Sequence, residues 1–151
     1  GISYGATTAI HLAAYDRRVS AVVALSPFSD MLSEVSHYTR TIGFPGIGPL
    51  MSEEKIQAAV DEAGYIGGYD PDDADASRAI RAASARVLLV HGKADLIIPY
   101  SHSQRIHEAA PDRTELLLLP GLGHFTIWVD PLGRVDRAAR DWFNAHLPPR
   151  Y

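Results

Sequence analysis

The sequence contains no cysteine, no long apolar run and no excess of positive charge. Without cysteine the chain cannot form disulfides, thiolate metal sites or a cysteine nucleophile, whereas the compartment stays open, with the cytoplasm favoured. No apolar run approaches the roughly 18 residues of a membrane span, so we expect none. Aspartate and glutamate (18) outnumber lysine and arginine (14), and the net charge is −4. We therefore expect no nucleic-acid partner, because such proteins present basic surfaces to phosphates.

Hydrophobic residues make up 46% of the chain and charged residues 21%, close to the average of globular proteins. This composition excludes a disordered chain, and a length of 151 residues is typical of one domain. The first residue is glycine rather than methionine, which indicates a piece of a longer protein. We therefore expect residues 1–151 to form part of a larger domain.

Three short apolar segments predict β-strands. They run from Val19 to Ser26, from Val87 to His91 and from Glu115 to Leu119. None of them alternates cleanly between apolar and polar residues. This favours strands that are covered on both faces, as in a parallel sheet.

Helical periodicity lies between and after these strands. Apolar residues recur at helical spacing from Ala6 to Ala14 and from Val135 to Leu147, and the second segment ends before Pro148-Pro149. The order of helix, strand, insert, strand, helix, strand and helix predicts an α/β fold with parallel strands. Shorter helices are predicted from Ser52 to Ala63, from Ala74 to Ala83 and from Pro99 to Ala110.

An insert interrupts this alternation between Pro27 and Ala85. Its glycine- and proline-rich run from Gly43 to Pro49 predicts a loop. We expect the insert to form a lid over one end of the sheet. Its aromatic residues either pack the lid or favour an apolar or aromatic group in a substrate. These aromatic residues are Phe28, Tyr38, Phe44, Tyr65 and Tyr69.

The first five residues, GISYG, form a Gly-x-Ser-x-Gly pattern. In a nucleophile elbow this pattern places a serine on a sharp strand-to-helix turn, and the glycines let backbones approach without Cβ clashes. A helix of small residues is expected directly afterwards, as the elbow requires. Ser3 is therefore the candidate nucleophile, and a plain glycine-rich turn is the alternative.

An aspartate follows the second predicted strand. The loop after His91 brings Asp95 to the carboxyl edge of the sheet, where α/β proteins place catalytic groups. A carboxylate there can hold an imidazole in one tautomer and stabilise its charged form. The alternative is a helix-capping aspartate before Pro99. Asp30, just after the first strand, is a rival for the acid role.

His124 lies in a glycine-bracketed loop after the third predicted strand. Such a loop lets the ring reach a neighbouring loop, as a general base must. His91 ends a strand and is expected to be packed or bonded to the backbone. His102 and His107 are separated by a spacing that suits one metal ion poorly, so we expect no metal site.

Serine, aspartate and histidine thus occur in the chain order of the α/β-hydrolase fold, which differs from the orders of other serine hydrolases. The chain resembles the C-terminal half of an α/β-hydrolase of the prolyl oligopeptidase-like and Xaa-Pro dipeptidyl-peptidase-like kind. GISYGATTAIHLAAYDRRVSAVVALSPFSD is similar to the elbow region of these proteins, VLLVHGKADLIIP to their acid loop and LLLLPGLGHF to their histidine loop. The resemblance implies three parallel strands with flanking helices and a lid insert over about residues 27–85.

Carried over residue by residue, the resemblance implies Ser3 as nucleophile, Asp95 as acid and His124 as base, with the backbone N–H of Tyr4 in the oxyanion hole. It implies a serine hydrolase of small ester, amide or peptide substrates, with no cofactor and no metal. In that family the first strands and the second oxyanion donor precede the elbow. We therefore expect the 151-residue chain alone to hydrolyse little, or to need an upstream half-domain or an oligomer partner. The alternative is a non-catalytic hydrolase-like fragment or a binding scaffold.

Overall fold

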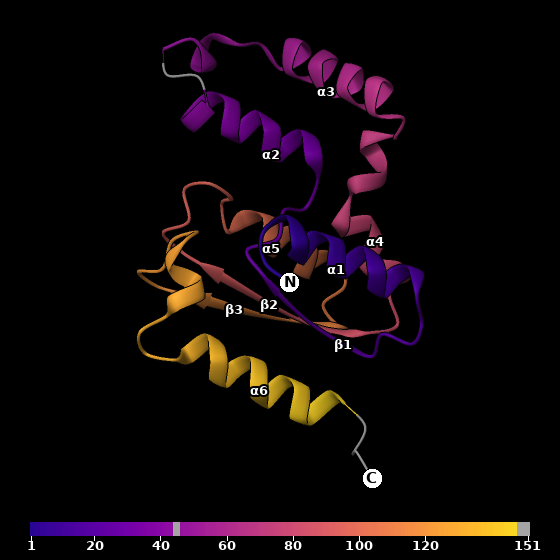
Figure 1. Cartoon of the computed structure of the whole chain (residues 1–151), viewed down its shortest axis with the longest axis vertical. Helices are drawn as coiled ribbons and strands as arrows, with labels where there is room; N and C mark the ends of the chain where they lie inside the picture. The colour runs from indigo at the N-terminus through magenta and orange to yellow at the C-terminus, as the bar shows by residue number, and fades with distance from the viewer. Residues whose placement is uncertain (44–45, 148–151) are drawn as a thin grey trace.

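Three parallel strands form the centre of the computed structural model, which describes residues 1–43 and 46–147 (Figure 1). They are β1 (Ala21–Leu25), β2 (Arg86–Gly92) and β3 (Thr114–Leu119), in the spatial order β1-β2-β3. The parallel register places Val22 beside Val87 and Val90 beside Leu117. The predicted sheet is therefore confirmed. β1 is shorter than the predicted strand at both ends. The Val19 N–H donates to the Asp16 carbonyl at 3.1 Å in the turn before the strand, and Ser26 leaves the extended conformation with a φ of 48°.

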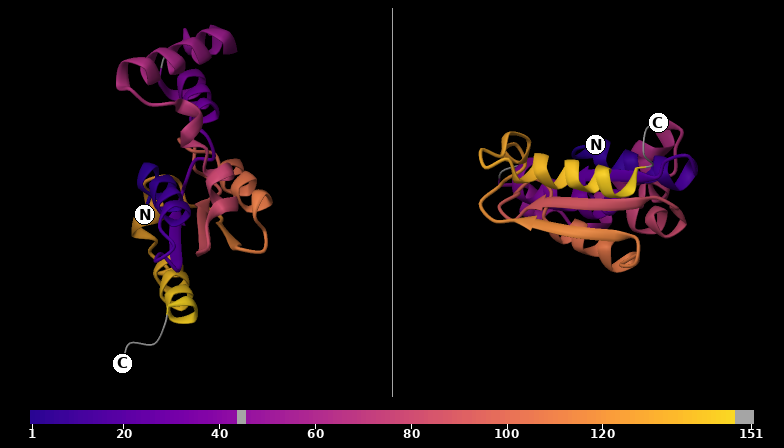
Figure 2. Two further views of the ribbon diagram at one scale, coloured as in Figure 1. Left: turned by 90° about the vertical axis from the view of Figure 1, so that its right-hand side faces the viewer. Right: turned by 90° about the horizontal axis from the view of Figure 1, so that it is seen from below.

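Helices cover both faces of the sheet (Figures 1 and 2). Successive side chains of a strand point to opposite faces, and apolar residues occur on both. Val22, Val87 and Leu89 face one layer, whereas Val23 and Leu88 face the other. The first layer consists of α1 (Tyr4–Tyr15), α4 (Ala76–Ala82) and α5 (Ser101–Ala109). The second layer consists of α6 (Arg134–His146) with the short 3-10 helix Thr126–Val129.

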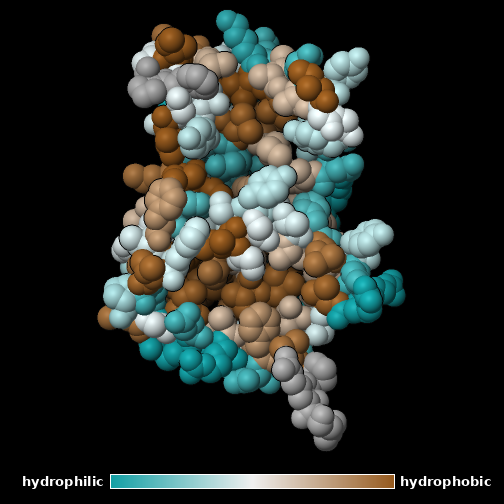
Figure 3. Space-filling view, in the orientation of Figure 1, coloured by the Kyte–Doolittle hydropathy of each residue, from teal (hydrophilic) through white to brown (hydrophobic). Residues whose placement is uncertain are grey.

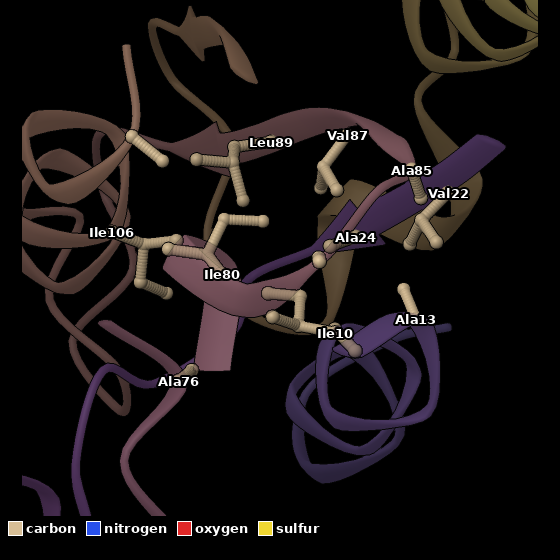
Figure 4. Close-up of a cluster of buried hydrophobic side chains, with 13 residues drawn as sticks. Ile10, Ala13, Val22, Ala24, Ala76, Ile80, Ala85, Val87, Leu89 and Ile106 are labelled. Atoms are coloured by element: carbon tan, nitrogen blue, oxygen red, sulfur yellow. The ribbon is translucent and has the colours of Figure 1, made fainter. Parts of the chain in front are cut away.

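The larger core lies between the sheet and the first layer. Figure 4 shows Ile10, Ile80 and Ile106, which come from three different helices, gathered around Val87 and Leu89. All five side chains are completely buried. Each buried side chain of this size stabilises the fold by roughly 1.5–3 kcal/mol, so this cluster holds the three helices on the strands.

The segment between β1 and β2 divides into two parts. Its first part projects away from the sheet on the side of α1, opposite α6, and lies at the top of Figure 1 (Figures 1 and 2). Its second part is α4, which supplies the completely buried Ala76 and Ile80 to the core. The projecting part contains α2 (Met31–Tyr38), the π-helical turn Thr39–Gly43, α3 (Glu53–Gly67) and the 3-10 helices Gly48–Leu50 and Pro71–Ala74.

The predicted loop from Gly43 to Pro49 ends in the 3-10 helix Gly48–Leu50, because the Leu50 N–H donates to the Ile47 carbonyl at 2.9 Å. Among the α-helices there are two differences from the sequence patterns. α2 was not predicted, because its apolar stripe is short; it begins where the Asp30 carboxylate accepts the Ser33 N–H at 2.8 Å. The predicted helix from Ala74 starts later, because Asp75 caps α4. The expectations for Phe44 and for Pro148-Pro149 concern positions outside the described residues. None of the described helices is long and apolar enough to cross a membrane.

Candidate active site

Ser3 lies on a sharp turn between a short extended segment and α1. The Leu25 N–H donates to the Gly1 carbonyl at 2.9 Å and the Ser3 N–H donates to the Leu25 carbonyl at 2.8 Å, so the segment runs parallel to β1. Ser3 has a φ of 52° and a ψ of −126°, a combination that a residue with a Cβ rarely adopts. The backbone of Ser3 therefore has the strained conformation that a nucleophile elbow requires.

The two glycines of the pattern differ in how strongly the structure requires them. A Cβ on Gly1 would lie 2.2 Å from the Gly5 carbonyl oxygen, so a side chain cannot be placed there. A Cβ on Gly5 would meet no described atom within 4 Å. The steric argument for glycine therefore holds at Gly1 and is not supported at Gly5.

Tyr4 is the first residue of α1. The Ser3 carbonyl accepts the N–H groups of Ala6 and Thr7 at 2.9 and 3.2 Å, so the helix starts directly at the elbow. The first N–H groups of a helix have no acceptor within the helix, and the helix dipole favours negative charge near them. The Tyr4 N–H is thus in a position that suits a developing oxyanion.

The loops that carry Asp95 and His124 are joined by backbone hydrogen bonds. The Lys93 N–H donates to the Leu119 carbonyl at 3.0 Å, and the Ala94 N–H donates to the Leu122 carbonyl at 2.9 Å. A Cβ on Gly92 would lie 2.2 Å from the Leu122 carbonyl oxygen, so this close approach requires glycine. Both loops follow adjacent parallel strands, which explains why residues far apart in the chain meet here.

The structure brings the three predicted site residues together. His124 Nδ1 lies 2.8 Å from Asp95 Oδ2, and His124 Nε2 lies 3.1 Å from Ser3 Oγ. Because a carboxylate only accepts, Nδ1 carries the proton, and Nε2 is left to accept the Ser3 hydroxyl proton. Ser3 is half-buried and His124 is buried. This arrangement can accept a proton from the serine as it attacks a carbonyl carbon.

The Asp95 side chain is completely buried and is negatively charged at neutral pH. Burial alone would raise its pKa, but hydrogen bonds from His91, the Ile98 N–H and His124 outweigh this and lower the pKa to about 2. Oδ1 accepts the N–H groups of Ile97 and Ile98 at 3.0 and 2.9 Å. Asp95 therefore faces His124 as a fixed anion throughout the neutral pH range.

Asp30, the rival acid, has a different role. It caps α2, accepts the Ser29 hydroxyl at 2.7 Å and lies 3.6 Å from the Arg105 guanidinium. Burial would raise its pKa, but hydrogen bonds from Ser33 and Ser29 outweigh this and lower it. The structure records no contact between Asp30 and His124 among the described residues.

A second group of polar side chains lies nearby and was not predicted. His102 Nδ1 accepts the Ser29 N–H at 3.1 Å and lies 2.8 Å from the Arg105 guanidinium, while its Nε2 lies 3.5 Å from Glu34 Oε2. Burial, aided by Arg105, lowers the pKa of His102 to about 4. Burial and the charges of Asp95 and Asp30 raise the pKa of Glu34 to about 7. Contacts between residues so distant in the chain leave no local sequence signal.

A cavity of about 300 Å³ opens beside the elbow. Tyr4, Phe28 and Tyr69 contribute aromatic surface to it, and the Tyr4 and Phe28 rings are 5.8 Å apart. Two other aromatic residues of the insert, Tyr38 and Tyr65, do not line this cavity, and Tyr65 is 85% exposed. Within residues 1–43 and 46–147, no cluster of three or more His, Asp or Glu side chains could hold a metal ion.

Comparison with known proteins gives a family match. The model of the prolyl oligopeptidase family matches residues 1–148. The uncharacterized protein YfhR of Escherichia coli strain K12 is 39% identical over 51 residues, which cover 34% of this chain and 18% of that protein.

Solved structures show the same fold at low identity. The acylaminoacyl peptidase of Pyrococcus horikoshii matches 100% of this chain and 24% of its own, with a TM-score of 0.69 and 18% identity. The esterase domain of a Rhodothermus marinus protein matches 98% of this chain and 60% of its own, with a TM-score of 0.67 and 16% identity. The meta-cleavage product hydrolase of Pseudomonas fluorescens IP01 matches 96% of this chain and 63% of its own, with a TM-score of 0.60 and 19% identity.

This chain therefore spans less than two thirds of each of these relatives. The structural likenesses establish the arrangement of strands and helices, and the family match covers nearly every residue of the chain. The chain has the α/β-hydrolase fold and belongs to the prolyl oligopeptidase family.

Proposed function

We propose that the protein is a serine hydrolase that works through an acyl-enzyme, with Ser3 as nucleophile, His124 as general base and Asp95 as the orienting acid. The observation that carries this proposal is the continuous hydrogen-bonded chain from Ser3 Oγ through His124 to Asp95 Oδ2. The family match supports it, because the family consists of hydrolases. The strained backbone of Ser3 supports it further.

In the proposed reaction Ser3 Oγ attacks the carbonyl carbon of an ester or amide, and its proton moves to His124 Nε2. The tetrahedral oxyanion lies near the Tyr4 N–H, and the family resemblance implies a second donor from a segment before the elbow. Collapse of this intermediate breaks the bond to the leaving group, which takes the proton from His124. Water then repeats the sequence on the acyl-Ser3 ester, releasing the acid and restoring the serine.

The proposed substrate class rests on the cavity whose lining includes Tyr4, the residue after Ser3. Tyr4, Phe28 and Tyr69 offer aromatic surface there, so we propose ester, amide or peptide substrates with an apolar or aromatic group. The structural neighbours include an acylaminoacyl peptidase and an esterase, which is consistent with either type of bond. A panel of short-chain, long-chain and aromatic p-nitrophenyl esters with aminoacyl amides distinguishes these classes. Equal rates across the panel would contradict an aromatic pocket.

The alternative is a hydrolase-like scaffold that lacks turnover unless a further half-domain or a partner completes it. An open apolar surface favours this alternative: Ile2, Val23, Leu25 and Phe143 line a cavity of about 400 Å³ beside β1. Figure 3 shows hydrophobic surface gathered between α1 and α6. Contact with further residues would cover this surface and stabilise the elbow.

The experiment that separates the two functions is hydrolysis of p-nitrophenyl esters by the full-length protein and by its Ser3→Ala variant. The exposed Ser101→Ala variant is the matched control. The proposal expects a rate that Ser3→Ala abolishes and Ser101→Ala retains. A folded full-length protein without Ser3-dependent hydrolysis would favour the scaffold.

A further inference from the structure

A second buried chain of polar groups reaches Asp95, in addition to His124. His91 Nδ1 lies 2.7 Å from Ser103 Oγ, and His91 Nε2 lies 2.8 Å from the Ile98 carbonyl oxygen and 3.5 Å from Asp95 Oδ2. The side chains of His91 and Asp95 are completely buried, and Ser103 is also inaccessible to solvent. The reaction proposed above uses neither His91 nor Ser103.

These contacts determine the tautomer of His91. The Ile98 carbonyl can only accept, so Nε2 of His91 carries the proton. Nδ1 is then the acceptor of the Ser103 hydroxyl proton. The Nε2–H is directed at the Ile98 carbonyl and also lies near Asp95 Oδ2. Because a donor to Nδ1 strengthens the N–H on the other side of the ring, Ser103 makes His91 a better donor.

Asp95 Oδ2 therefore lies near two imidazole rings, those of His124 and His91. His124 donates to it at 2.8 Å, and the Nε2–H of His91 lies at 3.5 Å. We propose that His91, held by Ser103, is a positioning residue that fixes the Asp95 carboxylate and withdraws part of its negative charge from His124. This inference extends the proposed function, because it assigns a task to two residues behind the acid.

The direction of the effect follows from electrostatics. The Nε2–H dipole of His91, 3.5 Å from Asp95 Oδ2, offsets part of the charge of the carboxylate, which then attracts the positive charge of protonated His124 less strongly. Removal of the His91 donor leaves more charge facing His124, which stabilises its protonated form. The pKa of His124 should therefore rise when His91 is replaced by a residue that cannot donate.

Other charged and titratable groups near Asp95 must be separated from this effect. Glu34 on α2 interacts with the charge of Asp95. His37, also on α2, lies 2.8 Å from the Leu96 carbonyl oxygen in the acid loop. From α5, His102 lies beside Glu34, and Arg105 lies beside His102 and Asp30. The pKa of Glu34 is about 7, so the measurement is repeated in a Glu34→Gln background.

The test is an NMR titration of the His124 ring in the full-length protein, together with the pH profile of kcat/KM. His91→Leu should raise the pKa of His124 by roughly half a unit and move the acid limb of the profile to higher pH by the same amount. It should also lower kcat roughly tenfold with little change in KM. Ser103→Ala should give a smaller shift in the same direction, and His91→Gln, which keeps a donor, should restore most of the wild-type pKa.

His107→Leu is the matched control, because His107 contacts Thr114 and not the three site residues. It should leave the pKa of His124 unchanged. A merely structural role for His91 would lower the folded fraction and leave this pKa unmoved, which would overturn the proposal, as would a fall in the pKa. If His91→Leu does not fold, Ser103→Ala and His91→Gln decide. The titration needs no turnover, so a protein that shows the shift but hydrolyses nothing would contradict the proposed function alone.

Discussion

Two Ser–His–carboxylate groupings lie close together in this molecule, and they differ in nearly every property that catalysis requires. In the first, His124 bridges Ser3 and Asp95 with hydrogen bonds of 3.1 and 2.8 Å. In the second, His102 Nδ1 lies 2.9 Å from Ser29 Oγ, and its Nε2 lies 3.5 Å from Glu34 Oε2, an atom without a hydrogen-bond partner among the described residues. The residue types match, but the chemistry does not.

The two groupings differ in whether the histidine has a lone pair available to the serine hydroxyl, and in whether a substrate can reach that hydroxyl. His124 Nε2 has the Ser3 hydroxyl as its recorded partner, whereas His102 Nδ1 is already occupied by the Ser29 N–H and the Arg105 guanidinium. Ser29 is only 1% exposed, so no substrate can reach its hydroxyl. Burial also lowers the pKa of His102 to about 4, which makes it a weak base. A serine, a histidine and an acid in contact are thus insufficient without these conditions.

The largest expected effect comes from replacing the two serines. Ser3→Ala should reduce kcat by on the order of 10⁴-fold or more, because the proposed acyl-enzyme cannot form. Ser29→Ala should leave kcat within a few-fold and lower the free energy of unfolding by about 1–3 kcal/mol, since it removes a buried hydrogen bond. Steady-state kinetics and urea unfolding measure both effects. Similar losses of kcat in the two variants would show that the groupings are not distinct.

Asp95→Asn should have the next largest effect. An asparagine NH₂ group facing His124 Nδ1 favours the tautomer with the proton on Nε2, and that nitrogen can then no longer accept the proton of Ser3. We expect kcat to fall by about 10⁴-fold while the protein stays folded. The equivalent change in the second grouping, Glu34→Gln, should alter kcat only a few-fold. A mild effect of Asp95→Asn on kcat would contradict the acid role.

The close contact between the acid and histidine loops predicts an intermediate effect for Gly92→Ala. The new Cβ would lie 2.2 Å from the Leu122 carbonyl oxygen, so the two loops must separate. A displacement of about 1 Å at His124 can cost 10²-fold in rate. Gly46→Ala tests an open position, because a Cβ there meets no described atom within 4 Å, although its φ of 83° adds strain. A kcat unchanged by Gly92→Ala would show that the loop spacing is not critical.

The smallest effect on rate, and the clearest on stability, is expected for Glu34→Gln. The folded-state pKa of Glu34 is raised from 4.5 to about 7, so its stabilising contribution is complete below pH 4.5 and is lost as the pH rises through 7. The Glu34 side chain is 14% exposed. At pH 8 the free energy of unfolding of the variant should therefore exceed that of the wild type by on the order of 3 kcal/mol, and at pH 5 the difference should be smaller.

Urea unfolding at the two pH values measures this difference, with the exposed Glu62→Gln as the control. A Glu34→Gln variant that gains nothing between pH 5 and pH 8 would mean that the wild-type carboxyl titrates normally.

The sequence predicted the first grouping and not the second, for a physical reason. Ser3, Asp95 and His124 each follow an apolar strand or precede a small-residue helix, and parallel strands bring such positions to one edge of a sheet. Ser29 and His102 meet only because α5 packs against the loop after β1, a contact between residues 73 positions apart. Burial of Glu34 depends on α2, whose short apolar stripe gave no clear helical signal.

The contacts of the residues behind Asp95 were also only partly predictable from the sequence. His91 was expected to be packed or bonded to the backbone, and its contact with the Ile98 carbonyl confirms this. Its partner Ser103 lies on α5, and nothing in the local sequence pattern links the two. The fold was therefore predictable from apolar periodicity, whereas the polar contacts that adjust the site required the packing of distant elements.

The most direct test of the central claim is the site of labelling by a fluorophosphonate probe in the full-length protein, mapped by mass spectrometry. A serine activated by His124 should react, and the buried Ser29 should not. The expected result is one modified serine, Ser3, with labelling lost in both Ser3→Ala and His124→Ala and retained in Ser29→Ala. An unlabelled Ser3 in the folded protein, or labelling that persists in His124→Ala at the wild-type rate, would contradict the account.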